Sequence, residues 1–210
     1  MDDMTLTRKE REKVRHRDDI LKAALKLFSE KGFHNVSVQD IAVESEFAVG
    51  TLYNFFQSKE QLFDELLNNC AQKIYQTLWP ILESKMQEDE ILRTLVRAYA
   101  KLAEENIEFI RLYISEYGTL SLILPHKSQA EKIKVLIDTK IREIIKSGIR
   151  NKIFRPVDVE IITIALLSTI RSFVFEASGD FDKNKIEQGL KKIEQLFIDS
   201  LLMAENRGNG

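Results

Sequence analysis

The stretch that decides the fold runs from Ser37 to Phe63 and reads SVQDIAVESEFAVGTLYNFFQSKEQLF. Ser37 followed by Asp40 is typical of a helix start, and a second short helix follows a turn near Glu46. Both segments share one inward apolar face, which consists of Val38, Ile41, Ala42, Leu52 and Phe55 or Phe56. Two short helices joined by a tight turn form a helix-turn-helix.

The tip of the second short helix is made of small residues, Val49-Gly50-Thr51. Glycine costs about 1 kcal/mol relative to alanine inside a helix, so Gly50 is a poor choice for stability alone. Close approach of the backbone to another surface would justify it, and a recognition helix in a DNA major groove needs that approach. The stretch therefore favours DNA binding over an ordinary helical hairpin in a core.

Helix-breaking residues are sparse around this stretch. No proline precedes Pro80, and Gly32 and Gly50 are the only glycines before Gly118. We therefore expect residues 1–79 to form several short helices joined by tight turns.

Local patterns also predict where these helices begin and end. Thr7 with Glu10, and Ser58 with Gln61, have the spacing of a capping box, so a helix is expected to begin at each. Gly32 stands where a left-handed residue ends a helix.

Beyond Pro80 the predicted helices lengthen. One spans 107–117, a break follows at 118–125, and Pro156 lies at a helix start, where its missing N–H costs nothing. The segment 161–175 is apolar almost all round, and such a helix must be buried on most faces. No stretch alternates in polarity every two residues, so the predicted fold class is all-α.

Composition sets outer limits on function. The chain has 210 residues, 31 basic and 33 acidic, and a formal net charge of −2, so any nucleic-acid contact must come from a local patch. Its one cysteine, Cys70, excludes an internal disulfide framework and fits a reducing compartment. The N-terminus lacks the apolar core of a signal peptide, and 161–170 is too short for a membrane span. We expect a cytoplasmic protein with no membrane partner.

The chain resembles the TetR family of bacterial transcription regulators over roughly residues 15–67. In the first helix the matching residues are Ile20, Ala23, Ala24, Leu27, Phe28, Lys31, Gly32 and Phe33. In the helix-turn-helix they are Ser37, Ile41, Ala42, Gly50, Thr51, Leu52, Tyr53, Phe56, Lys59 and Leu62. Many positions at fixed spacing must agree at once, so the combined motif is specific.

The resemblance implies an N-terminal three-helix helix-turn-helix DNA-binding domain and a C-terminal helical domain for effector binding and dimerisation. We place the first at 1–67, with a basic N-terminal extension, and the second at 68–206. The implied function is a ligand-responsive repressor that binds double-stranded DNA at a palindromic operator as a homodimer. The apolar stripes of the last two helices fit such pairing, and two recognition helices read twice as many base pairs as one.

The DNA-binding residues divide into two expected groups. The residues expected to face bases are Val49, Gly50, Thr51 and Asn54. Those expected to hold phosphates are Ser37, Gln39, Tyr53 and Lys59.

The turn departs from the family pattern, which usually reads Ala-Gly-Val-Ser where this chain has Ser45-Glu46-Phe47-Ala48. Glu46 replaces the expected glycine, so strain or a different turn shape is expected, and its carboxylate would repel nearby phosphate. Ala48 lacks the hydroxyl that would cap the recognition helix.

Residues 8–17 hold six basic and two acidic side chains, a net charge of +4. They precede the first family helix, where relatives often have an arm that reaches DNA. The alternatives are such an arm, which would follow the minor groove or the backbone, and a solvated charged segment. The capping box at Thr7 indicates a helix in place of a loose arm.

The second half of the chain is rich in aromatic residues, which either fill the core or line a pocket for an apolar or aromatic effector. The candidate ligand-binding residues are Trp79, Tyr99, Phe109, Tyr113, Arg171 and Phe175. Arg171 interrupts a nearly continuous apolar helix, and a buried charge needs a partner. An acid such as Glu116 or Glu176 is favoured as that partner over an anionic ligand.

No pattern indicates catalysis, a metal or a cofactor. The three histidines, His16, His34 and His126, have no cysteine or acid at ligand spacing, and the chain has no phosphate-binding glycine loop. We therefore expect no enzyme. The alternative function is an all-α enzyme or a helical binding module for a small apolar ligand.

Overall fold

The computed structural model describes residues 7–117, 129–178 and 181–203. In these ranges the only β pairing is an isolated bridge between Phe154 and Leu202, which confirms the all-α prediction. The predicted break at 118–125 lies outside the described residues. The elements in chain order are α1 (Arg8–Lys31), the 3-10 turn η2 (Phe33–Asn35), α2 (Val38–Glu44), α3 (Val49–Phe55), α4 (Lys59–Leu82), α5 (Glu88–Glu105), α6 (Ile107–Tyr117), α7 (Gln129–Arg150), α8 (Val159–Ala177), α9 (Lys183–Glu194) and the π turn η3 (Gln195–Asp199).

Local capping starts the N-terminal helices where the sequence predicts. Thr7 caps α1 with the full capping box, and Ser58 caps α4 by accepting a hydrogen bond from the Gln61 amide. Gly32 ends α1 at φ 80°, a conformation that glycine adopts without steric cost. Helix boundaries that depend on residues a few positions away in the sequence are therefore predicted well.

Helix lengths before Pro80 are predicted less well. The prediction of short helices holds for α2 and α3 but is wrong for α1, which has 24 residues. The capping box at Ser58 is expected to open a longer helix, and α4 indeed has 24 residues. No glycine or proline interrupts either helix until its last turn, so both continue. Pro80 itself lies inside the last turn of α4, and the helix ends only at Leu82.

The predicted position of Pro156 at a helix start is also wrong. Helix α8 begins at Val159, and Asp158 is its N-cap, whose side chain accepts a hydrogen bond from the Ile161 amide at 3.0 Å. An aspartate that satisfies an otherwise unpaired amide sets the start more strongly than a nearby proline.

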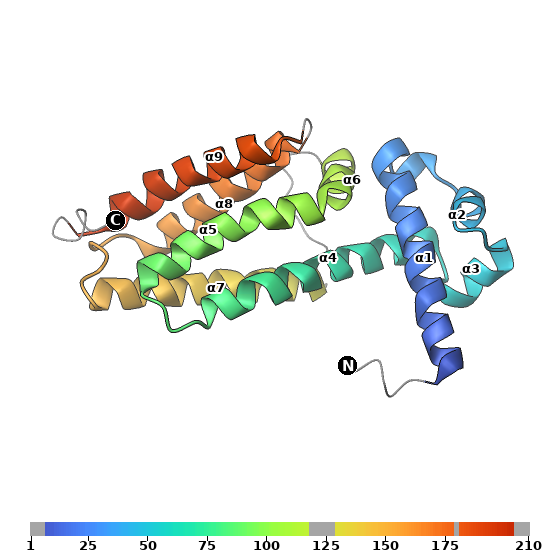
Figure 1. Ribbon diagram of the computed structural model, residues 1–210, viewed down its shortest axis with the longest axis horizontal. Helices are drawn as coiled ribbons and strands as arrows, with labels where there is room; N and C mark the ends of the chain where they lie inside the picture. The colour runs from blue at the N-terminus through green and yellow to red at the C-terminus, as the bar shows by residue number, and fades with distance from the viewer. Residues whose placement is uncertain (1–6, 118–128, 179–180, 204–210) are drawn as a thin grey trace.

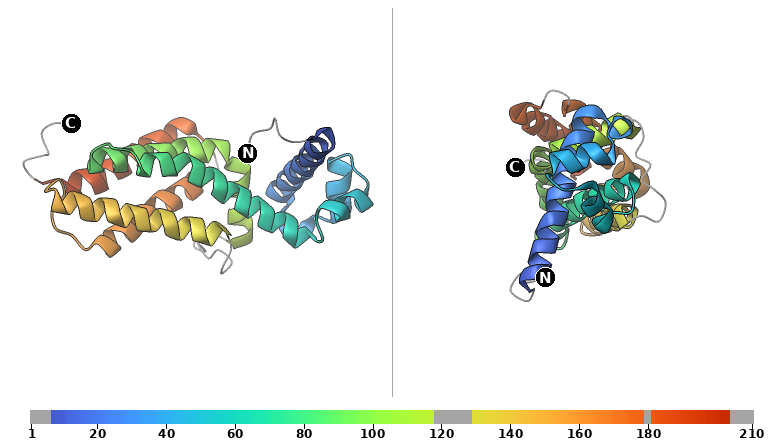
Figure 2. Two further views of the ribbon diagram at one scale, coloured as in Figure 1. Left: turned by 90° about the horizontal axis from the view of Figure 1, so that it is seen from below. Right: turned by 90° about the vertical axis from the view of Figure 1, so that its right-hand side faces the viewer.

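The described residues form two hydrophobic cores. The outline of the molecule is elongated (Figures 1 and 2). One core lies among α1, α2, α3 and the first half of α4. The other lies among the second half of α4 and helices α5, α7, α8 and α9. Along α4 the change of core falls between Leu67 and Ala71. The domain division at 67/68 stays a prediction.

Helix α6 connects the two cores. It lies at the junction beside α1 (Figure 1), and its Leu112 and Tyr113 are buried in the N-terminal core. Phe175 of α8 packs against that same core and stacks on Tyr113, with ring centroids 5.7 Å apart. Residues of α6 and α8 thus contact the same core on which α1, α2 and α3 pack.

Within the described residues, none of the helices combines the length and the apolar character that crossing a membrane requires.

Candidate DNA-reading surface and ligand cavity

Helix α3 packs on the N-terminal core through the buried Leu52 and the half-buried Val49 and Phe55. Leu52 is only 1% exposed and anchors the helix in the N-terminal core. Tyr53 and Asn54 are exposed, and an ideal Cβ at Gly50 would meet nothing within 4 Å. This face is therefore exposed around Gly50, Tyr53 and Asn54, and its contact with DNA stays a prediction.

Val49 and Thr51 are less accessible than the rest of that face. Both are half-buried, and Val49 packs against the N-terminal core. Ala48, the N-cap of α3, makes no side-chain hydrogen bond, as expected from its lack of a hydroxyl. Base contacts by Val49 and Thr51 remain predictions.

The two residues predicted to contact phosphate at the start of α2, Ser37 and Gln39, differ in the hydrogen bonds that they already make. Gln39 is exposed. The Ser37 amide and hydroxyl both donate to the Asp40 carboxylate, at 2.8 and 2.6 Å, and these bonds lower the pKa of that carboxyl. A phosphate contact by Ser37 would have to compete with its own cap.

Lys59 has a structural role that sequence reasoning missed. Its ammonium donates to the backbone carbonyls of Phe33 at 2.7 Å and Val36 at 2.9 Å, and lies 4.2 Å from the Phe33 ring centroid. One of its three N–H groups is left over for a phosphate oxygen. Lys59 therefore ties α4 to the turn after α1, and its phosphate contact stays a prediction.

Glu46 has the conformation that a glycine would adopt more easily. Its φ is 60°, in the left-handed region, which costs a residue with a side chain about 1–2 kcal/mol. The strain predicted for this turn is therefore present, and the side chain is exposed beside α3.

Residues 8–17 form the first turns of α1, so a loose arm is excluded. Figure 2 shows these turns extending away from the rest of the molecule. Lys9, Arg11, Lys13 and Arg15 are exposed along them. Arg17 instead turns inward, where it pairs with Glu65 and donates to the Phe55 carbonyl at 3.0 Å.

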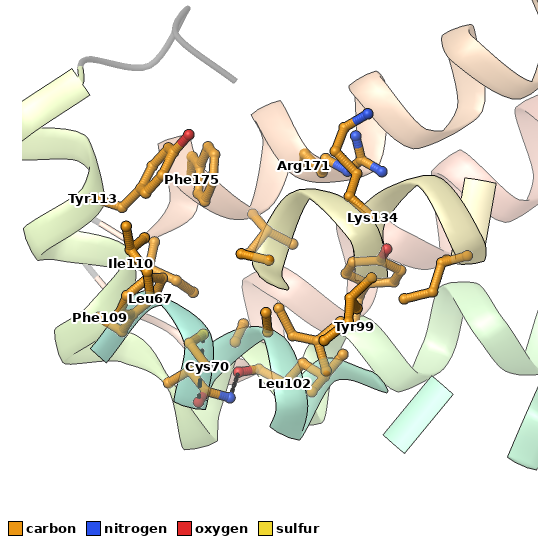
Figure 3. Close-up of a pocket in the computed structure, with 18 residues that line it drawn as sticks. Leu67, Cys70, Tyr99, Leu102, Phe109, Ile110, Tyr113, Lys134, Arg171 and Phe175 are labelled. Carbon is orange, nitrogen blue, oxygen red and sulfur yellow. Dashed lines mark hydrogen bonds between the residues drawn. The ribbon is translucent and has the colours of Figure 1, made fainter. Parts of the chain in front are cut away.

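A cavity of about 180 Å³ lies between α4, α5, α6, α7 and α8 (Figure 3). Five of the six predicted ligand residues line it: Tyr99, Phe109, Tyr113, Arg171 and Phe175. Trp79 does not, and this is a correction, because it stacks on Tyr75 at 5.2 Å beneath the Lys140 ammonium. Both lie nearer the C-terminal end of α4, past the cavity-lining residues of that helix.

One end of the cavity carries its charges. Arg171 Nη2 lies 2.8 Å from Asp138 Oδ1, and Lys134 Nζ lies 2.9 Å from Asp138 Oδ2. The expected acidic partner is thus present, but it is Asp138 and not Glu176. The side chain of Glu116 lies outside the described residues, so that alternative stays a prediction. Burial raises the pKa of the neighbouring Tyr99 hydroxyl, and the Arg171 guanidinium acts in the opposite direction.

The sequence analysis missed Lys134 and Asp138. Asp138 is buried beside Ile137 and Ile141, so an acid next to an apolar stripe was the available signal. The partner on α8 lies 33 positions away in the chain, and no local spacing connects them.

The other polar groups of the cavity are neutral. Burial raises the pKa of the Cys70 thiol to about 12, so it stays protonated, and its Sγ lies 4.0 Å from Asn106 Oδ1. The Asn106 amide donates to the Leu102 carbonyl at 2.8 Å. Across the described ranges, no three His, Cys, Asp or Glu side chains gather as metal ligands would.

Two family models match the chain. Residues 20–66 match the bacterial regulatory proteins of the tetR family, and residues 86–192 match the tetracyclin repressor-like C-terminal domain. The chain is 24% identical over 159 residues to the uncharacterized HTH-type transcriptional regulator YhgD of Bacillus subtilis, covering 75% of this chain and 81% of YhgD. It is 27% identical over 151 residues to the HTH-type transcriptional repressor KstR2 of Mycolicibacterium smegmatis, covering 70% of this chain and 71% of that repressor.

A solved structure shares the fold. FadR of Bacillus subtilis, a transcriptional regulator crystallised in complex with stearoyl-CoA, superposes with a TM-score of 0.68 over 87% of this chain and 98% of its own. At 19% identity this likeness concerns the fold alone.

Proposed function

The chain belongs to the TetR family of bacterial regulatory proteins, and we propose that it represses transcription from a palindromic operator, which it binds as a homodimer and leaves when a small apolar effector fills the cavity. That it is a ligand-responsive, DNA-binding transcription regulator follows from its family and its repressor relatives. The alternative, an all-α enzyme or binding module, is not favoured, because the family consists of regulators. A protein that binds the chromosome would work in the cytoplasm.

The observation that carries the DNA-binding proposal is the face of α3. Gly50 leaves open space where a side chain would stand, and Tyr53 and Asn54 are exposed on the same short helix. The exposed Gly50 has no side chain and contributes nothing to the core. It does let a helix backbone approach base edges closely.

Dimerisation is supported by apolar side chains that one chain leaves uncovered. Ile161 and Ile164 of α8 are 66% and 53% exposed, and Leu196 of η3 is 67% exposed. Helix α8 packs beside α9, which continues into η3 (Figure 1), so these exposed residues lie on neighbouring helical segments. A two-fold contact through these segments would place two α3 helices on one operator.

Release by an effector is supported by residues that belong to the cavity and to the N-terminal core at once. Phe109, Tyr113 and Phe175 line the cavity and also pack against the core beneath the helix-turn-helix. A ligand that separates the Tyr113–Phe175 stack would displace α6 against α1. In the dimer, the ligand-bound state would then have a different distance between the two α3 helices than the DNA-bound state. An operator that fits only the DNA-bound distance is released.

The chemistry of the cavity supports an apolar or aromatic effector. Rings and aliphatic side chains form most of its wall, and a cavity of about 150 Å³ with such a wall is known to hold a benzene-sized molecule. FadR, which shares the fold, was crystallised with stearoyl-CoA, a ligand with a long apolar tail.

Selection of genomic DNA fragments by the purified protein, followed by sequencing, tests the proposal. We expect a palindromic motif with two half-sites about one helical turn apart. Enrichment without a motif, lost as salt rises, would mean phosphate attraction alone and would contradict the proposal.

Sedimentation of the Ile161→Glu and Ile164→Glu proteins tests dimerisation through α8. Both proteins are expected to be monomeric.

A further inference from the structure

The cavity has two chemically distinct ends. Figure 3 shows Arg171 and Lys134 together at one end, and Leu67, Phe109 and Ile110 at the other. Tyr113 and Phe175 lie side by side between α6 and α8. A ligand that fits both ends carries an apolar body and one polar group.

The charged end is not balanced by its acid. Among the described residues, Asp138 is the single carboxylate that contacts Arg171 and Lys134, and each of its oxygens is bonded to one of them. Within the described part of the chain, two cations therefore share one negative charge. Because Arg171 and Lys134 line the cavity and Asp138 does not, the excess positive charge faces the cavity.

The geometry leaves donors for an anion. Arg171 bonds Asp138 through Nη2, and a guanidinium carries five N–H donors in a planar fork. The side chain of Arg171 is 17% exposed, so water screens its charge less than at a surface. A planar acceptor with two oxygens fits such a fork better than a spherical ion does.

We propose that the effector is a small apolar carboxylic acid, whose carboxylate binds Arg171 and Lys134 while its hydrocarbon part contacts Tyr113 and Phe175. This inference rests on the proposed function, because it names the ligand class of the cavity that the function requires. Asp138 has a second role in it. It bonds both cations from outside the cavity lining and so keeps them in place. Its own negative charge also lowers their affinity for a second one.

Binding of octanoate to the DNA-free protein, measured by calorimetry beside 1-octanol and octanoyl-CoA, tests the inference. We expect octanoate to bind at least about tenfold more tightly than 1-octanol, as hydrogen bonds to charged groups predict. Arg171→Gln should weaken octanoate about tenfold and leave 1-octanol unchanged. Asp138→Asn should strengthen octanoate several-fold, because both cations then face the ligand without a competing charge.

The matched control is Lys140→Gln, on the same helix as Lys134. Lys140 pairs with Glu83 at 2.6 Å, outside the cavity, so octanoate affinity should not change. Thermal melts of every variant identify any that fail to fold, and Arg171→Lys, which keeps the charge, should restore part of the affinity.

Three results would overturn the inference: equal affinity for octanoate and 1-octanol, octanoate binding that Arg171→Gln leaves unchanged, or octanoyl-CoA binding that is tighter than octanoate and insensitive to Arg171. None of them concerns DNA. If the genomic selection still returns a palindrome, the regulator stands and only the ligand class is wrong.

Discussion

The two halves of the molecule differ in what surrounds their helical glycines. In the N-terminal half, Gly50 has open space around it, and Tyr53 and Asn54 face solvent. In the C-terminal half, Gly148 and Gly189 stand where an added Cβ would lie 2.2 Å from Phe154 and 1.9 Å from Phe173. The first glycine has open space beside it, whereas the other two are required by the packing of their own chain.

The same contrast holds for arginine. Arg15 is exposed on the extended turns of α1, but Arg17, two residues later, binds Glu65 and the Phe55 carbonyl inside the N-terminal half. Arg171 belongs to the cavity. Residue type alone therefore does not tell which residues face a partner; the packing around them does.

The largest expected effect separates the glycines. Gly148→Ala should destabilise the protein by about 2–3 kcal/mol, because the buried Phe154 ring cannot move away from the new methyl group. Gly50→Ala should leave stability equal or up to about 1 kcal/mol higher. It should nevertheless weaken operator binding at least tenfold. Denaturant melts measure the stability of both variants, and operator titrations measure their affinity for DNA. A Gly50→Ala protein with unchanged operator affinity would contradict a role of Gly50 in DNA binding.

The second effect separates the arginines of α1. Arg17→Ala should cost about 2 kcal/mol, because it leaves Glu65 and a backbone carbonyl without their partner. Arg15→Ala should change stability by less than about 0.5 kcal/mol. If α1 follows the DNA backbone, Arg15→Ala should also reduce the salt slope of operator binding by about 1. An unchanged slope would mean that Arg15 does not contact DNA phosphate and that the basic turns of α1 are simply solvated.

The third effect concerns the two kinds of DNA contact on α3. Tyr53→Phe removes one exposed hydroxyl and should weaken binding about fivefold on every sequence, the value of one hydrogen bond of about 1 kcal/mol. Thr51→Ala should instead alter which sequences are selected. Selection repeated with each protein distinguishes them; a changed motif for Tyr53→Phe would reverse the assignment.

The smallest effect concerns the turn. Glu46→Gly should stabilise the protein by about 0.5–1 kcal/mol, because the left-handed φ of 60° then carries no strain. Operator binding should strengthen as well, because a carboxylate near phosphate is lost. Glu46→Gln separates the two causes: it should strengthen binding and leave stability as it is. Equal stability of the wild-type and Glu46→Gly proteins would show that the turn stores no strain.

The sequence predicts the N-terminal half well because its determinants are local. Caps at Thr7, Ser37 and Ser58, and the positive φ of Gly32, depend on residues within four positions. The missed features depend on distant partners. Lys59 bonds carbonyls 23 and 26 positions away.

The cavity follows the same rule. The sequence left core filling and a pocket as alternatives for its aromatic residues, and four of those it named line the cavity. Which ring lines the void and which stacks elsewhere, as Trp79 does, depends on how five helices meet. The acid that pairs with Arg171 was likewise set by the contact between α7 and α8 and not by spacing along the chain.

The most direct test of the account is the affinity of the protein for its selected operator, measured by fluorescence anisotropy at rising octanoate concentration. We predict release of the operator, with octanoate binding the DNA-free protein more tightly than the operator complex by the same factor that octanoate weakens DNA binding. Octanoate that binds the cavity and leaves operator affinity unchanged would contradict the coupling of the cavity to the helix-turn-helix through α6.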